Sequence, residues 1–109
     1  MAKEVNRGEI WLYTFDAPDK RRPVIVISRQ VLLDVTHSAI VVPITSQRRG
    51  APTEVDLGIE DGLKGASCAN AANIQTVSKA RLTRYVGSVR REKLNQLCEA
   101  LAIASGCAD

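Results

Sequence analysis

Short apolar runs separated by polar turns fill most of the chain, a pattern typical of β-strands. Residues 23–28 and 38–45 are nearly continuous apolar runs, which predicts strands buried on both faces. Residues 8–15 and 53–57 alternate between polar and apolar side chains, which predicts strands with one exposed face. Three shorter strands are expected at 67–70, 73–77 and 85–88. The first and middle parts of the chain therefore predict a sheet of short strands.

The connections and the end of the chain follow other patterns. Residues 16–20 have turn chemistry, 58–65 form a loop, and 30–34 fit one helical turn. An apolar stripe at helical spacing follows, made of Leu94, Leu97, Cys98 and Leu101. We expect Ser88 to cap the start of this helix and Gly106 to end it. The predicted fold is mainly β with a C-terminal helix, arranged as a small SH3-like barrel.

Length and composition fit one small globular unit. The chain has 109 residues, so we expect a single domain spanning 1–109. Hydrophobic residues make up 45% of the chain but aromatic residues only 4%, so the core must consist mainly of Val, Ile, Leu and Ala. A core of this size gives limited stability, which favours self-association into a homodimer.

Charge points to an anionic partner. The net charge is +3 and the pI is near 9.0. Basic residues cluster at 20–22 and 48–49, whereas the middle of the chain is acidic through Glu54, Asp56, Glu60 and Asp61. Each basic cluster, taken alone, is explained more simply as a solvated loop.

The sequence lacks the residues that several classes of functional site require. The three cysteines, Cys68, Cys98 and Cys107, form no CxxC pair, so reduced thiols in a cytoplasmic protein are the simplest interpretation. No secretory signal or membrane-length apolar run is present. The single histidine, His37, has no nearby Cys or carboxylate partners and is expected to have a structural or surface role. Because phosphate-loop, HExxH and GxSxG motifs are also missing, we expect no metal and no cofactor.

Three polar features remain as candidates for chemistry. Arg22 opens a buried strand, where a rigid guanidinium can hold a phosphate. Thr45 and Ser46 end another strand, where a hydroxyl and backbone N–H groups can bind an anionic oxygen. Amides at 70–75 could pair with the edges of unstacked RNA bases. Each feature alone fits an ordinary structural role slightly better, and the alternating Trp11, Tyr13 and Phe15 fit a core better than a base-stacking platform.

In their order along the chain, these pieces resemble the MazF/PemK toxin family. The matching motifs are Arg-Gly-Glu-Ile-Trp at 7–11, Arg-Pro-Val-Ile-Val-Ile-Ser at 22–28, Val-Pro-Ile-Thr-Ser at 42–46, and Asn-Ile-Gln-Thr-Val-Ser-Lys-Ala-Arg-Leu at 73–82. Each motif is short, but four in order with fitting spacing make a specific pattern that covers residues from about 6 to 104.

The resemblance implies an SH3-like barrel of the PemK/CcdB type that forms a homodimer. It implies a metal-independent endoribonuclease, the toxin of a type II toxin–antitoxin system, that cuts single-stranded mRNA. The 2′-OH would attack the adjacent phosphate and leave 2′,3′-cyclic phosphate and 5′-OH ends. It also implies inhibition by a MazE-like antitoxin whose acidic C-terminal tail lies across the RNA site.

By the same resemblance, Arg22 and Thr45 match the catalytic residues of the family. A guanidinium keeps its proton at neutral pH, so we expect Arg22 to stabilise charge and to serve as a proton donor before it serves as a base. The expected RNA-binding residues are Lys20, Arg21, Ser46, Gln47, Arg48, Asn70, Asn73 and Gln75.

Two departures from the family pattern leave the cutting sequence open. The loop at 16–21 is shorter than in many relatives, and Ala72-Asn73 stands where relatives often have an acidic residue followed by Gln. Two alternative functions remain. One is a CcdB-like DNA gyrase poison, which the chain's ending disfavours because it lacks Trp-Gly-Ile. The other is a non-catalytic SH3-like module that binds Pro-rich peptides on an aromatic groove.

Overall fold

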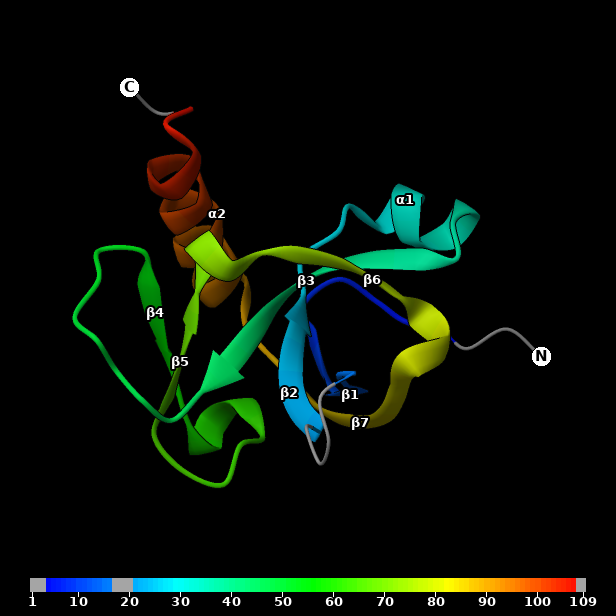
Figure 1. Ribbon diagram of the computed structural model, residues 1–109, viewed down its shortest axis with the longest axis horizontal. Coiled ribbons are helices and arrows are strands. Elements are labelled where there is room, and N and C mark those ends of the chain that lie inside the picture. Colours follow the sequence, from blue (N-terminus) through cyan, green and yellow to red (C-terminus); the bar gives the residue numbers. More distant parts are fainter. Residues whose placement is uncertain (1–3, 17–20, 108–109) are drawn as a thin grey trace.

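Strand β3 (Ser38–Thr45) is the centre of the fold in this computed structural model, which describes residues 4–16 and 21–107. The other strands are β1 (Glu9–Thr14), β2 (Arg21–Val26), β4 (Glu54–Leu57), β5 (Ser67–Asn70), β6 (Gln75–Ser78) and β7 (Leu82–Ser88). The α-helices are α1 (Gln30–Val35) and α2 (Arg91–Ser105), and the 3₁₀ turns are η1 (Ile59–Asp61), η2 (Ala71–Asn73) and η3 (Lys79–Arg81). The predicted mainly β fold with a C-terminal helix is confirmed (Figure 1).

The sheet is antiparallel and bends at β3. Its order is β4-β5-β3-β2-β1-β7, and β6 pairs with β3 outside that path. One edge of β3 is shared, because residues 38–41 pair with β6 and residues 44–45 pair with β5. Among the described residues β4 and β7 do not pair, so the expected small barrel is a strongly bent sheet that does not close.

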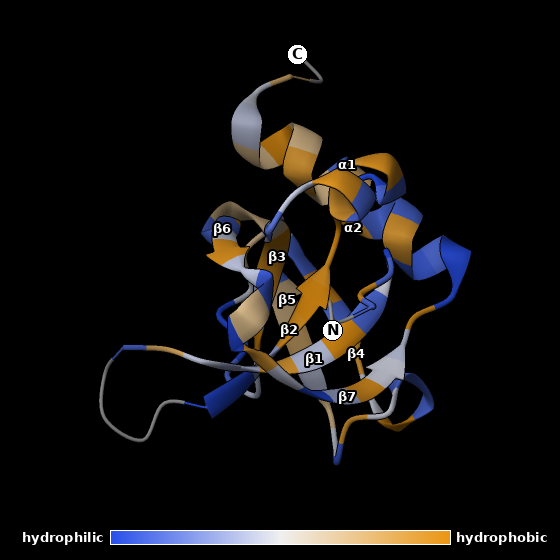
Figure 2. Ribbon diagram, turned by 90° about the vertical axis from the view of Figure 1, so that its right-hand side faces the viewer, coloured by the Kyte–Doolittle hydropathy of each residue, from blue (hydrophilic) through white to orange (hydrophobic). Residues whose placement is uncertain are grey.

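Two apolar clusters pack on the two faces of the central strands. Val24 and Val26 belong to one cluster with Trp11 and Tyr13, whereas Ile25 belongs to the other. This alternation explains why β2 is a continuous apolar run, because both of its faces are covered. The second cluster includes Leu97 and Ala100 of α2, which lies over this face at the left of Figure 1. Figure 2 shows the apolar strands enclosed by more polar connections.

The Arg7-Gly8 turn ties the start of the chain to the rest. Gly8 has φ +90°, a conformation that favours glycine, and its N–H donates to the Val26 carbonyl at 2.8 Å. The Gly8 carbonyl accepts from the Val89 N–H at 2.9 Å, and the Arg7 guanidinium donates to the Ile27 carbonyl. The start of the first family-like motif therefore has a structural role at this turn.

Most predicted elements are confirmed, with differences at their ends. β3 and β5 have the predicted bounds. The prediction that Ser88 caps α2 is wrong, because Ser88 ends β7 opposite Glu9 and Arg90 occupies the N-cap position. Gly106 does end the helix, with φ 76°. Asn73 belongs to η2, so the strand predicted from residue 73 begins at Gln75 instead.

Two other strands begin earlier than predicted. β2 starts at Arg21, and Pro23 precedes the first β2–β3 pair, where a missing N–H is tolerated. β7 starts at Leu82. Its start was not predicted because several consecutive residues of the strand are exposed, so the sequence shows no clear alternation there. Residues 17–20 of the predicted turn lie outside the described residues. No helix in the described part of the chain is long and apolar enough to span a bilayer.

Candidate functional site

A hollow opens where β2 and β3 part. The last pair between these strands joins Val24 to Pro43. Arg22 and Thr45 lie two residues beyond this pair, one on each strand, so their side chains are on the same face of the sheet. β3 pairs there with β5 rather than with β2, and a cavity of about 830 Å³ forms beside the two side chains. The fold thus brings the two predicted catalytic residues to one cavity.

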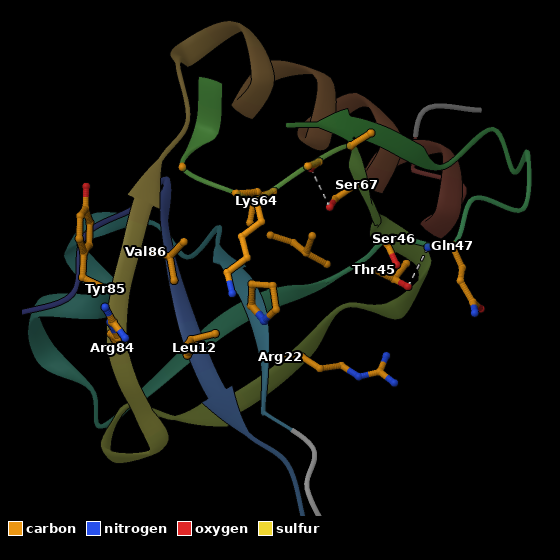
Figure 3. A pocket seen from close by; sticks show the side chains of 16 residues that line it. Leu12, Arg22, Thr45, Ser46, Gln47, Lys64, Ser67, Arg84, Tyr85 and Val86 are labelled. Carbon is orange, nitrogen blue, oxygen red and sulfur yellow. Dashed lines mark hydrogen bonds between the residues drawn. The ribbon is translucent and has the colours of Figure 1, made fainter. Parts of the chain in front are cut away.

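Five parts of the chain surround this first hollow (Figure 3). Leu12 of β1 and Pro23 of β2 contribute apolar surface, and residues 44–47 continue from the end of β3. The loop 62–67 and residues 84–86 of β7 complete the lining. Figure 3 shows the Lys64 side chain reaching from the loop toward β2, while Arg22 extends toward the side of Thr45 and Gln47.

A local turn orients the hydroxyl of Thr45. Its Oγ1 accepts a hydrogen bond from the Gln47 N–H at 3.2 Å. Because that bond uses an oxygen lone pair, the hydroxyl proton remains available to donate to an anionic oxygen. Thr45 is half-buried, whereas Ser46 and Gln47 beside it are exposed and also line the hollow.

The charge in the first hollow is positive. Arg22, Lys64 and Arg84 line it, and none of its lining residues is Asp or Glu. Within residues 4–16 and 21–107, none of these three cations forms a salt bridge. Cations that lack a local carboxylate produce a positive potential that concentrates anions.

A second hollow of about 560 Å³ lies on the other side of Arg22. Its lining combines the aromatic ring of Phe15 with the amides of Asn73 and Gln75 and with Pro43 and Ile74. Amides and an aromatic ring are the groups that recognise an unstacked base. Because Arg22 lines both hollows, it stands between a cationic pocket and an amide-lined pocket.

The other predicted RNA-binding residues lie in different surroundings. Arg21 is exposed and pairs with Thr14, on the opposite face of β2 from Arg22. Arg48 donates to Asp56, and this hydrogen bond and the charge of Asp56 raise the pKa of Arg48. Asn70 lines neither hollow. Lys20 lies outside the described residues.

Asn70 has a local structural task. Its Oδ1 accepts from the Ala72 N–H at 3.0 Å, which caps η2, and from the Thr53 hydroxyl at 2.6 Å. Asn73, at the other end of η2, is exposed and faces the second hollow. The amides in this segment therefore divide into a capping residue and pocket residues.

Sequence reasoning missed Lys64, Ser67, Arg84 and Tyr85, which all line the first hollow. Lys64 stands in a loop between Gly62 and Gly65, a cue that a cation is displayed on a tight turn. Nothing in the sequence links that loop to β7, because the two meet only through the folded sheet.

Trp11 and Tyr13 are not available to line an open groove, whereas Tyr85 is exposed in the first hollow and Phe15 lines the second. Trp11 is 9% exposed and Tyr13 is 6% exposed, and both belong to the core as predicted. The Trp11 Nε1 donates to Glu9 at 3.0 Å, and the Tyr13 ring meets the Phe15 ring edge to face at 4.6 Å. A peptide-binding SH3 groove needs several exposed aromatic residues side by side, so the burial of Trp11 and Tyr13 argues against the interaction-module alternative. Among the described residues no three His, Cys, Asp or Glu side chains are grouped to hold a metal ion.

The chain is similar to known proteins over most of its length. A family profile described as "PemK-like, MazF-like toxin of type II toxin-antitoxin system" matches residues 6–105. The "Probable endoribonuclease MazF5" of Mycobacterium tuberculosis is 33% identical over 102 residues, 93% of each chain. The solved "Mycobacterium tuberculosis toxin MazF-mt6" is 31% identical with a TM-score of 0.82, over 90% of this chain and 96% of that one. A mycobacterial "Endoribonuclease in complex with its cognate antitoxin" is 32% identical with a TM-score of 0.83, over 94% and 96%.

Proposed function

The chain belongs to the PemK-like, MazF-like toxin family of type II toxin–antitoxin systems, and from this we infer that it is a sequence-selective endoribonuclease that cuts single-stranded mRNA. One observation of the site carries this proposal. Arg22 lies between a cationic hollow that contains Thr45 and an amide-lined hollow. In this position Arg22 can hold the phosphate that is cut, while the adjoining RNA backbone lies in the first hollow and a base lies in the second.

The proposed reaction uses the substrate's own nucleophile. The 2′-oxygen attacks the adjacent phosphorus, its proton passes to solvent, and the bond from phosphorus to the 5′-oxygen breaks. The 5′-oxygen gains a proton, which leaves a 2′,3′-cyclic phosphate and a 5′-OH. Since the nucleophile and the leaving group both belong to RNA, the protein's task is positioning and charge stabilisation.

Arg22 and Thr45 divide that task. The Arg22 guanidinium stabilises the extra negative charge of the phosphorane and is the candidate proton donor to the 5′-oxygen. The Thr45 hydroxyl, oriented by the Gln47 N–H, donates to a non-bridging phosphate oxygen. Asn73 and Gln75 read the base that enters the second hollow.

The partners follow from the charge and the family. A relative of this fold is a mycobacterial endoribonuclease in complex with its cognate antitoxin. For this chain we propose a MazE-like antitoxin whose acidic tail covers the cationic hollow and competes with RNA. We also propose a homodimer that acts in the cytoplasm. A monomeric mass in sedimentation at micromolar concentration would contradict the dimer.

Purified protein incubated with RNA in EDTA tests the activity. Wild type should cut at a short sequence and leave 2′,3′-cyclic phosphate and 5′-OH ends, mapped by ligation before and after end repair. Arg22→Ala and Thr45→Ala should each slow cutting by about 10²–10³-fold, whereas Thr45→Ser, which keeps the hydroxyl, should retain most activity. Cutting by Arg22→Ala at the wild-type rate would refute the proposed site. Gyrase poisoning without RNA cutting would favour the CcdB-like alternative.

A further inference from the structure

The backbone of the loop 62–67, which carries Lys64, is held by local hydrogen bonds beside the candidate site. The buried Asp61 carboxylate accepts from the Gly58 N–H at 2.9 Å, and the Leu63 N–H donates to the Gly58 carbonyl at 3.3 Å. Gly62 turns the chain with φ +94°. At the far end, the Ser67 hydroxyl donates to the Gly65 carbonyl at 3.2 Å. Both ends of the loop are therefore tied, which limits the positions open to Lys64.

Lys64 and Arg84 are cations of the first hollow that the proposed reaction does not use. Arg84 lies on β7 opposite Leu12, which also lines the hollow, and the Lys64 side chain extends from the loop (Figure 3). Both residues are exposed, neither forms a salt bridge within the described residues, and the lining contains no carboxylate. Because the lining holds cations and no carboxylate, binding of an anion in the hollow lowers the electrostatic energy of the site.

The volume of the hollow indicates more than one bound group. A cavity of about 830 Å³ lies within the range of about 300–1,000 Å³ that holds a whole small ligand. The reacting phosphate at Arg22 and Thr45 occupies one end, and Lys64 and Arg84 are left for the chain that continues from it. We propose that Lys64 and Arg84 form a second phosphate subsite, which binds a backbone phosphodiester next to the one that is cut. This inference rests on the proposed function.

The test compares three variants with a control. The variants are Lys64→Gln, Arg84→Gln and the double variant that carries both substitutions, and the control is Arg91→Gln. Arg91 is exposed in the first turn of α2, lies outside both hollows, and its substitution removes one positive charge, as each single variant does. Binding of a fluorescein-labelled 2′-O-methyl oligouridine of 15 nucleotides, which cannot be cut, is measured by anisotropy from 50 to 300 mM KCl. Circular dichroism melting checks that each variant folds.

Each lost phosphate contact should lower the slope of log affinity against log salt by about 0.7, and the double variant should bind about tenfold more weakly at 100 mM. With cleavable RNA, KM should rise and kcat should change little, because the subsite binds the substrate and transition state equally. Lys64→Arg, which keeps the positive charge, should bind the oligouridine as tightly as the wild type.

Other results separate the two proposals. If wild type cuts RNA but the three variants match Arg91→Gln in slope and KM, the phosphate subsite is wrong and the endoribonuclease stands. If wild type does not cut RNA, the proposed function fails, and the salt slopes still decide whether Lys64 and Arg84 bind a phosphate backbone. If the wild-type protein does not bind the oligouridine, the subsite is refuted.

Discussion

Arg21 and Arg22 are consecutive in β2 but serve opposite faces of the strand, because Arg22 lines both hollows and Arg21 lines neither. The register places Arg21 against Thr14 and Arg22 against Tyr13 in β1. Neighbouring side chains of a strand alternate in direction, so the sheet separates two residues that the sequence presents as one basic cluster. A charge-only view would make the two arginines equivalent, whereas the fold does not.

The pair gives a direct test of position against charge. Arg22→Ala should lower kcat/KM by at least about 10²-fold, whereas Arg21→Ala, which removes the same charge, should change it by about threefold or less. Single-turnover cutting of a fluorogenic RNA measures both. Equal losses in the two variants would mean that general charge, and not the placement of Arg22, supports activity.

Substitution of Asn70 should change the stability of the protein, whereas substitution of Asn73 should change where RNA is cut. Asn70→Ala removes the cap of η2 and leaves the Thr53 hydroxyl, in a residue that is 8% exposed, without its acceptor. The free energy of unfolding should fall by about 1–2 kcal/mol in urea denaturation. Asn70→Asp keeps the acceptor and serves as the control.

Asn73→Ala should leave the unfolding free energy within about 0.5 kcal/mol, because the residue is exposed. Its effect should appear in the distribution of cutting sites across a long transcript. An unchanged distribution, together with reduced stability, would reverse the roles assigned to the two asparagines.

These contrasts mark the limit of what the chain predicts. A continuous apolar run predicted β3 correctly because a strand covered on both faces needs apolar residues along most of its length. Arg22 and Thr45 could be predicted as site residues because they lie in motifs that resemble those of a known family. Lys64 and Arg84 were not found, because the hollow that joins them forms only when the loop 62–67 meets β7. Local sequence likewise does not reveal which asparagine caps a turn and which faces a pocket.

The three thiols should differ in reactivity. Cys98 and Cys107 are exposed, whereas Cys68 is fully buried in β5, and burial followed by the charge of Glu54 raises the pKa of the Cys68 thiol. At pH 8, Ellman's reagent should label Cys98 and Cys107 in the native protein and Cys68 only in urea. The Cys68→Ala variant should show the same native count and one thiol fewer in urea.

The shifted thiol also gives a pH dependence with a definite sign. A raised pKa means that the folded state favours the protonated thiol, so the contribution to stability is complete below the ordinary thiol pKa of about 8.5. It is lost as the pH rises through the raised folded value. The unfolding free energy of wild type should therefore fall relative to Cys68→Ala above about pH 8.5. A constant difference from pH 7 to 10 would contradict this expectation.

Gly87 is the point where β7 touches the turn that leads to Lys64. A Cβ at this position would lie 2.4 Å from the Asp61 carbonyl oxygen and 3.1 Å from the Gly62 Cα, both backbone atoms that cannot rotate away. Gly87→Ala should therefore reduce the unfolding free energy by about 2–3 kcal/mol, because either β7 or the η1 turn must shift. Gly65→Ala is the matched control, since a Cβ there meets no atom within 4 Å. Urea denaturation followed by the fluorescence of Trp11 compares the two variants, and equal stability would show that β7 and η1 are not held in this contact.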